Sequence, residues 1–197
     1  MAKIIKLCFF VGCVASAAIG MACGRTGAGE TEKHEKDDEV EWNVSVHRAV
    51  QFTDSLTGVS TDAYYTVADT AAVNEKLRSV RPENLTLGWT VPWSDGVIFL
   101  VAYENEPVLS GKVKVTEVNS ISSYGGDVQV AFKFPDADKW AEITRKNIGK
   151  RLAIFVNGQL MSAPQVNTEI EHGNCSVTIP ASGIKDYLPD YVLERVS

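Results

Sequence analysis

The chain has 197 residues, of which 45% are hydrophobic and 22% are charged, and it contains four cysteines. This composition is typical of a globular protein that is long enough to bury a substantial core. The formal net charge is −6. An acidic chain without a basic stripe argues against nucleic-acid binding, which depends on neutralising phosphates, and against electrostatic attachment to anionic lipid.

The first 22 residues have the form of an export signal. Lys3 and Lys6 make its positive end. Residues 7–22 are apolar or small, and the segment is too short to span a bilayer comfortably. Gly20 and Ala22 are small residues at the positions that a signal peptidase reads. The sequence therefore predicts a signal peptide over residues 1–22.

Cys23 directly follows this segment, and the arrangement resembles the signal of a bacterial lipoprotein. There the thiol receives a diacylglycerol group, so the resemblance implies lipidation of Cys23 and a membrane anchor made of acyl chains. The pattern favours Leu three residues before the cysteine, where this chain has Gly20. The alternative is plain secretion with Cys23 as a free N-terminal thiol.

Residues 23–41 show no hydrophobic periodicity and are rich in acidic side chains. The burial available to such a composition cannot offset the entropy lost on ordering, so we expect a flexible tether. A second interpretation is a sorting signal, because acidic residues after a lipidated cysteine resemble surface-export signals of some Gram-negative lipoproteins.

The next part of the chain reads as strand, helix and hairpin. Residues 44–52 suggest a first strand that is interrupted at Arg48. A short helix is expected over residues 69–78, with an aspartate at its start. Alternation over residues 85–93 predicts a strand, and residues 97–103 are expected to return as its hairpin partner.

The strongest pattern lies in residues 127–179. Alternating apolar residues predict a strand over 128–134, and helical spacing then predicts the main helix over residues 136–148. Residues 152–156 form an apolar run of buried-strand length. Asn157-Gly158 is a strong hairpin signal, and a second turn at His172-Gly173 leads into a last strand.

This stretch resembles the head of the first periplasmic domain of SecD and SecDF, the accessory membrane subunits of the bacterial Sec export machinery. The resemblance is carried by TRKNIGKRLAI at residues 144–154, Val156-Asn157-Gly158, Ser162-Ala163-Pro164, Ile170, Gly173 and Ile179. Weaker similarity upstream involves residues 68–74, residues 85–89 and Leu109-Ser110-Gly111. In that family the head is thought to contact polypeptide that emerges from the translocon, and transmembrane helices couple its movement to the proton gradient.

We therefore expect an α+β fold of small mixed or antiparallel sheets, with the main helix packed on the C-terminal sheet. The expected organisation is an N-terminal α+β lobe over residues 42–111, a SecD-head-like lobe over residues 112–182, and a C-terminal tail over residues 183–197.

Few residues have the arrangement that catalysis or metal binding needs. His34 and His47 have no second ligand at metal-binding spacing. His172 and Cys175 are a close pair, which could be a thiolate activated by imidazole or simply a turn residue followed by a small buried residue. Once the signal is removed and Cys23 is modified, Cys175 has no disulfide partner.

Two further groups have both a chemical and a structural interpretation. Asp136, Asp138 and Glu142 lack the continuation of a calcium loop and suit the first turns of a helix. Trp89 and Trp93 read as core residues or as a partly exposed aromatic groove for an extended peptide. We expect no catalytic residues, no cofactor and no metal site.

These observations predict a non-enzymatic, extracytoplasmic binding protein that is anchored through Cys23, in the periplasm or at the outer-membrane surface. Its expected partners are the membrane, exported polypeptide or Sec components, and not nucleic acid. Because no transmembrane segment follows the domain before Ser197, only the recognition part of the SecD role is expected. The alternative is a structural or surface-exposed lipoprotein that uses the lobe as a scaffold.

Overall fold

The computed structural model describes residues 39–80, 82–121 and 127–194. The chain divides into Met1–Glu39, of which Glu39 alone is described, and Val40–Ser197, which holds every described helix and strand. The expected signal peptide, Cys23 and nearly all of the expected tether therefore lie outside the described residues.

The described elements are strands joined by tight turns and a few short helices. The strands are β1 (Glu41–Val50), β2 (Tyr65–Thr66), β3 (Leu85–Trp89), β4 (Val97–Ile98), β5 (Leu100–Glu104), β6 (Leu109–Ser120), β7 (Val128–Lys133), β8 (Arg151–Val156), β9 (Gln159–Ser162) and β10 (Asn174–Ile179). The α-helices are α1 (Thr70–Leu77), α2 (Ala137–Lys146) and α3 (Asp190–Leu193). Short 3-10 turns are η1 (Val67–Asp69), η3 (Glu171–Gly173) and η4 (Ala181–Asp186).

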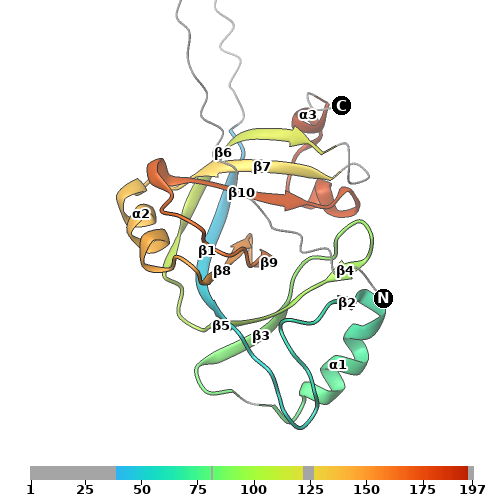
Figure 1. Ribbon diagram of the computed structural model, residues 1–197. Helices are drawn as coiled ribbons and strands as arrows, with labels where there is room; N and C mark the ends of the chain where they lie inside the picture. Colours follow the sequence, from blue (N-terminus) through green and yellow to red (C-terminus); the bar gives the residue numbers. More distant parts are fainter. Residues whose placement is uncertain (1–38, 81, 122–126, 195–197) are drawn as a thin grey trace, which may run out of the picture. The chain divides into compact units, whose positions relative to one another are not determined.

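Strand β1 is the centre of one eight-stranded sheet. The order is β10-β7-β6-β1-β5-β3, and β8 joins the other edge of β1 and carries β9. Val44 pairs with Gly111 of β6 on one side and with Val156 of β8 on the other. The pairing of β1 with β6 ends at Val46, and β5 then pairs with Ala49 and Val50 of β1. Figure 1 shows β1 running from the β6–β7–β10 layer towards β3 and β5.

The α+β class is confirmed, and two details of the expected strands are corrected. The sheet is one large antiparallel sheet rather than several small ones, apart from the pair β2–β4. Arg48 does not interrupt the first strand: it lies within β1 and pairs with Leu152. Its exposed side chain is accommodated because it forms an ion pair with Glu104, with 3.1 Å between Nη1 and Oε2.

The boundary expected between the two lobes falls inside β6. Strand β1 pairs with β5 and β6, which begin before that boundary, and with β8, which lies after it. Residues on both sides of the boundary therefore share one continuous sheet.

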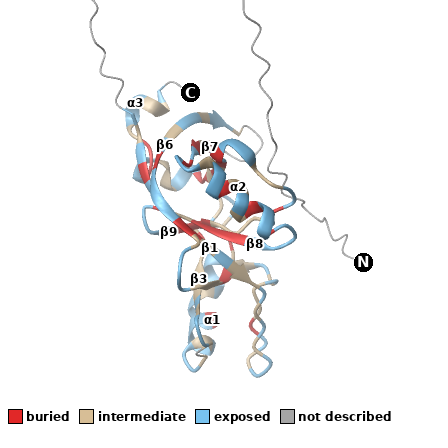
Figure 2. Cartoon of the chain, turned by 90° about the vertical axis from the view of Figure 1, so that its left-hand side faces the viewer, coloured by how far each residue is buried: buried red, intermediate tan, exposed pale blue. Residues whose placement is uncertain are grey.

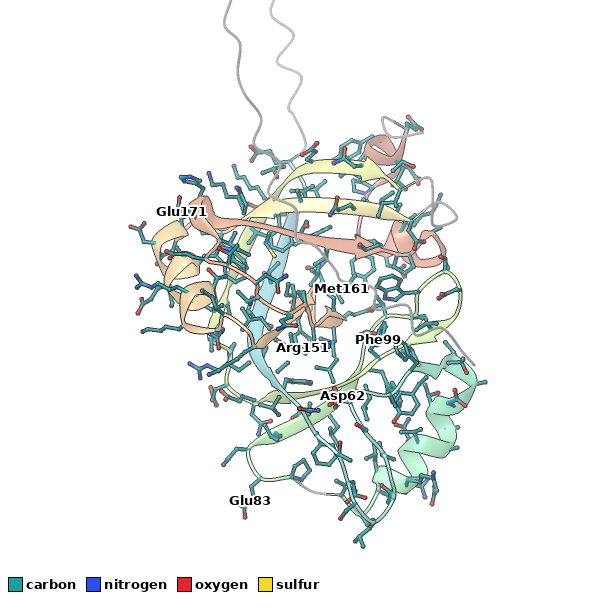
Figure 3. The ribbon with its side chains drawn as sticks, viewed as in Figure 1. Asp62, Glu83, Phe99, Arg151, Met161 and Glu171 are labelled. Atoms are coloured by element: carbon teal, nitrogen blue, oxygen red, sulfur yellow. The ribbon has the colours of Figure 1, made fainter. Side chains whose placement is uncertain are left out.

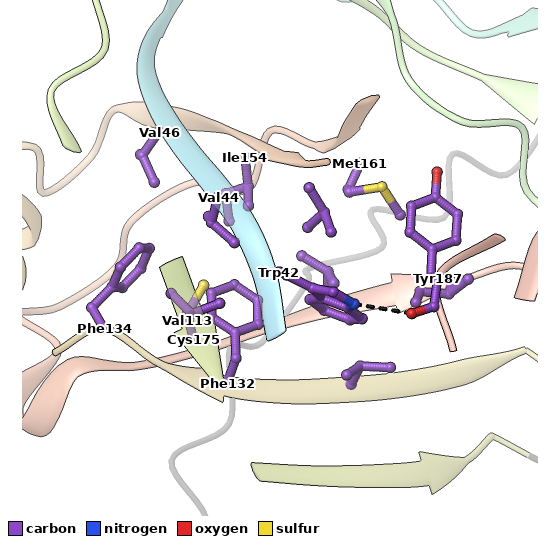
Figure 4. Close-up of a cluster of buried hydrophobic side chains, with 14 of the residues drawn as sticks. Trp42, Val44, Val46, Val113, Phe132, Phe134, Ile154, Met161, Cys175 and Tyr187 are labelled. Carbon is purple, nitrogen blue, oxygen red and sulfur yellow. Dashed lines mark hydrogen bonds between the residues drawn. The ribbon is translucent and has the colours of Figure 1, made fainter. Parts of the chain in front are cut away.

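The main core covers the inner face of β1. Trp42, Val44 and Val46 alternate along the strand and are each at most 2% exposed. The indole Nε1 of Trp42 donates a hydrogen bond to the carbonyl oxygen of Tyr187 at 3.0 Å, and its ring meets the edge of Phe132 (Figure 4). Full burial of one large apolar side chain contributes about 1.5–3 kcal/mol, so this cluster fixes the face that β1 turns inward.

Helix α2 covers one end of this core. Asp136 caps it, because Oδ1 accepts a hydrogen bond from the backbone nitrogen of Lys139 at 3.0 Å. Trp140 is buried, and its Nε1 donates to the carbonyl oxygen of Asn174 in β10 at 3.0 Å. The helix ends at Lys146, earlier than expected, and Ile148 is 51% exposed. Helix α1 lies at the opposite end, beside β2 and β4 (Figure 1).

Both expected turns of the C-terminal half are present. Asn157 and Gly158 have φ of 49° and 82°, and they join β8 to β9. Positive φ at both central residues matches the twist of a two-residue hairpin, which explains the Asn-Gly pair. His172 and Gly173, with φ of 63° and 76°, lead into β10.

The sheet curls until its far strands meet. Just after β3, the backbone nitrogen of Val91 donates to the carbonyl oxygen of Leu160 in β9 at 2.9 Å. Within the curl, Val101, Ala153 and Leu160 form a second buried cluster on the outward face of β1 and β8. Both faces of β8 are thus covered, and Figure 2 shows it coloured as buried beside β1.

Candidate functional site

The outward face of β1 carries polar side chains that alternate with the core residues. Among them, His47 is held between two strands. Its Nδ1 lies 2.9 Å from the carbonyl oxygen of Glu104, and its Nε2 lies 3.3 Å from Oγ of Ser45. A carbonyl can only accept, so Nδ1 carries a proton and donates to it, while Nε2 faces the Ser45 hydroxyl.

Two aromatic rings surround His47. The ring centroids of Tyr103 and Phe155 lie 5.4 Å and 5.0 Å from that of His47, and 5.0 Å from each other, all in edge-to-face contact. Gly88 makes room for this group, because a Cβ there would lie 3.2 Å from Cε1 of Tyr103. Burial raises the pKa of the Tyr103 hydroxyl.

Phe99 extends this group towards β2. Its ring contacts Tyr64, with 5.8 Å between centroids, and Trp93, with 6.1 Å. Phe99, Tyr103 and Phe155 all pack on the buried cluster of Val101, Ala153 and Leu160. Figure 3 marks Phe99 beside the strands that carry this cluster. We call the whole set the aromatic band: Tyr64, Trp93, Phe99, Tyr103, Phe155 and His47.

The band is partly exposed along its length. Tyr64 is 74% exposed, and the other five side chains are half-buried. A side chain that is anchored on one face and open on the other can contact a ligand without first losing much conformational freedom. Aromatic residues in this situation contribute much of the binding energy in protein interfaces.

A shallow hollow of about 330 Å³ adjoins the band at Ser45. It is lined by Asn43, Val44, Ser45, Ser110, Gly111, Lys112 and Gly158. Gly111 has no positive φ, and a Cβ there would meet nothing within 4 Å, so neither strain nor crowding accounts for its glycine. Glycine in a strand can instead leave the backbone open to an approaching ligand or chain.

Two segments that the sequence singled out meet at this hollow. Leu109-Ser110-Gly111 belongs to β6, and Asn157-Gly158 is the turn after β8. Asn157 holds its turn to β1, because its Oδ1 accepts from the backbone nitrogen of Asn43 at 3.0 Å and its own nitrogen donates to the Asn43 carbonyl at 2.8 Å, while β6 pairs directly with β1. The sequence identified both segments but carried no signal that they come together.

His172 and Cys175 occupy very different environments. The His172 side chain is exposed, and its Nε2 lies 3.6 Å from the carboxylate of Glu171. Cys175 is a buried free cysteine, and desolvation raises the pKa of its thiol to about 12. Nucleophilic cysteines need a lowered pKa, so burial of Cys175 has the opposite effect from activation.

The carboxylates at the start of α2 have local roles. Asp136 is the helix cap, and Glu142 pairs with Lys146, which lowers the pKa of Glu142. In the part of the chain that the structure describes, no three or more His, Cys, Asp or Glu side chains gather as ligands for a metal ion. Over the same residues, no helix has both the length and the apolar character to cross a membrane.

Trp89 and Trp93 do not share a strand face, so the alternative interpretation of an aromatic groove along one strand is wrong. Strand β3 ends at Trp89, whose Nε1 donates to Oδ1 of Asn74 at 2.9 Å and whose ring packs on Tyr65. Trp93 lies in the following turn, where its backbone nitrogen donates to the carbonyl oxygen of Val97 at 2.8 Å. Only Trp93 therefore belongs to the aromatic band.

Residues 94–182 match the family model of the SecDF P1 head subdomain. Among curated proteins, the translocase subunit SecD of Acidaminococcus fermentans is 33% identical over 76 residues, which are 38% of this chain and 18% of that protein. SecD of Sebaldella termitidis is 44% identical over 55 residues, 27% of this chain and 14% of that protein. SecDF of Thermus thermophilus is 36% identical over 73 residues, 36% of this chain and 10% of that protein. The chain thus spans less than a fifth of the length of these relatives.

Solved structures of SecDF also align with this chain. A crystal structure of SecDF in a super-membrane-facing form covers 74% of this chain and 17% of that chain, at 20% identity and a TM-score of 0.37. A SecDF structure described as that of a membrane component that enhances protein export covers 70% of this chain and 55% of that chain, at 21% identity and a TM-score of 0.34.

Proposed function

Because residues 94–182 match the SecDF P1 head subdomain, we propose that this chain is a non-enzymatic binding protein that contacts exported polypeptide outside the cytoplasm. The name of its relatives, protein translocase subunit, supports a role beside the Sec machinery. The observation that carries the proposal is the aromatic band, of which Phe99, Tyr103 and Phe155 pack on one buried cluster, with the hollow at Ser45 beside it.

An extended, unfolded polypeptide is the ligand that this surface suits best. Its apolar side chains can contact the rings of the band whatever its sequence, because the contact relies on area rather than on a set of hydrogen bonds. Its backbone can approach β1 and β6 at Gly111, where no side chain intervenes. Recognition of extended peptides commonly combines these two kinds of contact.

The binding test uses a permanently unfolded polypeptide as the probe, ribonuclease A held open by reduction and alkylation, with native ribonuclease A beside it. Tyr64→Ala and Trp93→Ala remove rings of the band, and Leu56→Ala is the matched control because Leu56 is 93% exposed and outside the band. We expect the first two variants to weaken binding of the unfolded probe about tenfold, the effect of a typical interface aromatic. Equal binding by all three variants would mean that the head serves only as a scaffold.

We further propose that Cys23 is lipidated and holds the protein at the membrane, on the periplasmic side or at the outer-membrane surface. The support is the signal-like segment directly before it and the acidic stretch after it. Mass spectrometry of the N-terminal peptide from cells should find an acylated Cys23, and Cys23→Ser should release the protein from membranes. An unmodified thiol at residue 23 in membrane-extracted protein would overturn the anchor.

A further inference from the structure

The connection between α2 and β8 concentrates positive charge around an exposed apolar side chain. Arg145, Lys146, Lys150 and Arg151 are all exposed, and Ile148 between them is 51% exposed. We call these five residues the basic turn. The proposed function makes no use of it, although Arg151 begins β8, the strand that carries Phe155 of the aromatic band.

Few acidic groups offset this charge. The sequence has no Asp or Glu between Glu142 and Glu169. Glu142 pairs with Lys146 and also attracts Arg145, while Glu171, on the 3-10 turn that packs against α2, lies 3.6 Å from His172. Across the described residues, Lys150 and Arg151 form no ion pair, so the turn keeps a net positive charge.

The backbone of the turn does not neutralise these cations either. Asn147 Nδ2 donates to the carbonyl oxygen of Ile143 at 2.8 Å. The backbone nitrogen of Val166 donates to the carbonyl oxygen of Lys150 at 2.8 Å, and that of Gly149 donates to the carbonyl oxygen of Val166 at 2.8 Å. These carbonyls are therefore occupied within the protein, and apart from Lys146, which pairs with Glu142, the cationic side chains of the turn remain exposed.

We propose that the basic turn binds the headgroups of anionic phospholipids, with Ile148 entering the interface between headgroups and acyl chains. Cations that surround an exposed aliphatic side chain match the two layers of a membrane surface. The net negative charge of the chain opposes this binding only weakly, because salt screens charges that lie more than about 8 Å away. The charge of the basic turn itself therefore determines whether the protein binds anionic lipid, although the acidic composition of the whole chain suggests that it would not.

The experiment measures co-sedimentation of the full chain with vesicles. Vesicles of phosphatidylcholine containing phosphatidylglycerol are compared with pure phosphatidylcholine. All proteins carry Cys23→Ser, so that no acyl chain at that position contributes. The test variant is Arg145→Glu with Lys150→Glu and Arg151→Glu. Its matched control is Lys76→Glu with Arg78→Glu and Lys185→Glu, which changes the net charge equally at exposed sites elsewhere.

The basic turn predicts binding to the anionic vesicles that weakens with salt and is reduced by the test variant but not by the control. Each cation near an anionic surface changes affinity roughly fivefold, so loss of the three positive charges alone predicts a fall of about a hundredfold. The three added glutamates make this a lower bound. Salt weakens the charge contacts but not the apolar contact, so Ile148→Ser should reduce the binding that remains at high salt.

Two results would overturn the proposal. Equal binding by the test and control variants would show that net charge, not the turn, governs attachment. Binding of a polyglutamate peptide that depends on the turn, without vesicle binding, would assign the turn to an acidic protein instead. Tyr64→Ala should leave vesicle binding unchanged, so this test can fail without affecting the proposed polypeptide site.

Discussion

Gly173→Ala should destabilise the fold much more than Gly149→Ala, although both glycines have nearly the same backbone conformation. Their φ values are 76° and 80°, a region in which any L-residue costs roughly 1–2 kcal/mol. A Cβ at Gly173 would lie 2.5 Å from the carbonyl oxygen of Phe134, whereas a Cβ at Gly149 would meet nothing within 4 Å. Comparing the two variants therefore separates the free-energy cost of a positive φ from the free-energy cost of the steric clash with Phe134.

The contact at Gly173 is with backbone and cannot be relieved by a side-chain rotation. The backbone nitrogen of Phe134 also donates to the carbonyl oxygen of Gly173 at 2.9 Å, so the clash pushes apart two segments that a hydrogen bond joins. Overpacking of this kind costs about 1–3 kcal/mol, and the weakened hydrogen bond adds roughly 1 kcal/mol. We expect a total loss of about 3–6 kcal/mol for Gly173→Ala and about 1–2 kcal/mol for Gly149→Ala.

Urea unfolding followed by tryptophan fluorescence measures both values, with the m-value as a check that each variant unfolds between the same two states. Equal losses in the two variants would refute the close approach of Gly173 to Phe134. So would a stable Gly173→Ala protein whose near-ultraviolet circular dichroism matches the wild type.

Three further changes test other parts of the structure. Thr144→Val should cost about 1–3 kcal/mol in urea unfolding, because Oγ1 of Thr144 accepts from the backbone nitrogen of Ile170 at 2.9 Å, and Thr144→Ser should cost clearly less; equal costs would contradict this. The Cys175 thiol stays protonated in the fold up to about pH 12 but ionises near 9.0 when unfolded, so stability should fall as pH rises past 9.0. Cys175→Ala should show a shallower fall, and an identical pH dependence would refute the buried thiol. A fragment of residues 94–182 lacks β1 and should give the poorly dispersed NMR spectrum of an unfolded chain, whereas residues 40–197 should give a dispersed one; a folded fragment would show that β1 is dispensable.

The local structure of the C-terminal half could be read from the sequence because each signal there is short-range. The Asn157-Gly158 pair requires positive φ at both residues, and the alternation in β7 reflects one buried face. The helix was expected two residues too long at its C-terminal end because Ile148 continues the apolar spacing. In the structure the chain reverses at Gly149, and Ile148 is left exposed.

The central position of β1 could not be read from the sequence. Its partners β6 and β8 lie far along the chain, and such pairings leave no local pattern. Arg48 looked like a break because it falls where an apolar residue would continue the inward alternation. In the structure the core ends at Val46, and the next inward position opens to solvent, where Glu104 pairs with the arginine.

The sequence does not reveal the aromatic band, because its members come from β1, β5, β8 and three connecting segments. Each ring alone is typical of a core residue. One available signal was the unbroken apolar run of β8, since a strand without alternation is buried on both faces and needs a second cluster. Phe155 in that run packs on the second cluster and contributes to the band.

The most direct test of the account places a photoreactive amino acid at Tyr64 in cells that express the full chain, with the same amino acid at Tyr191 of α3 as the matched position. If the band holds polypeptide during export, Tyr64 should crosslink to unfolded secreted proteins and Tyr191 should not. Crosslinking that is absent from Tyr64, or that is equal at the two positions, would contradict the assignment of the aromatic band as the binding surface.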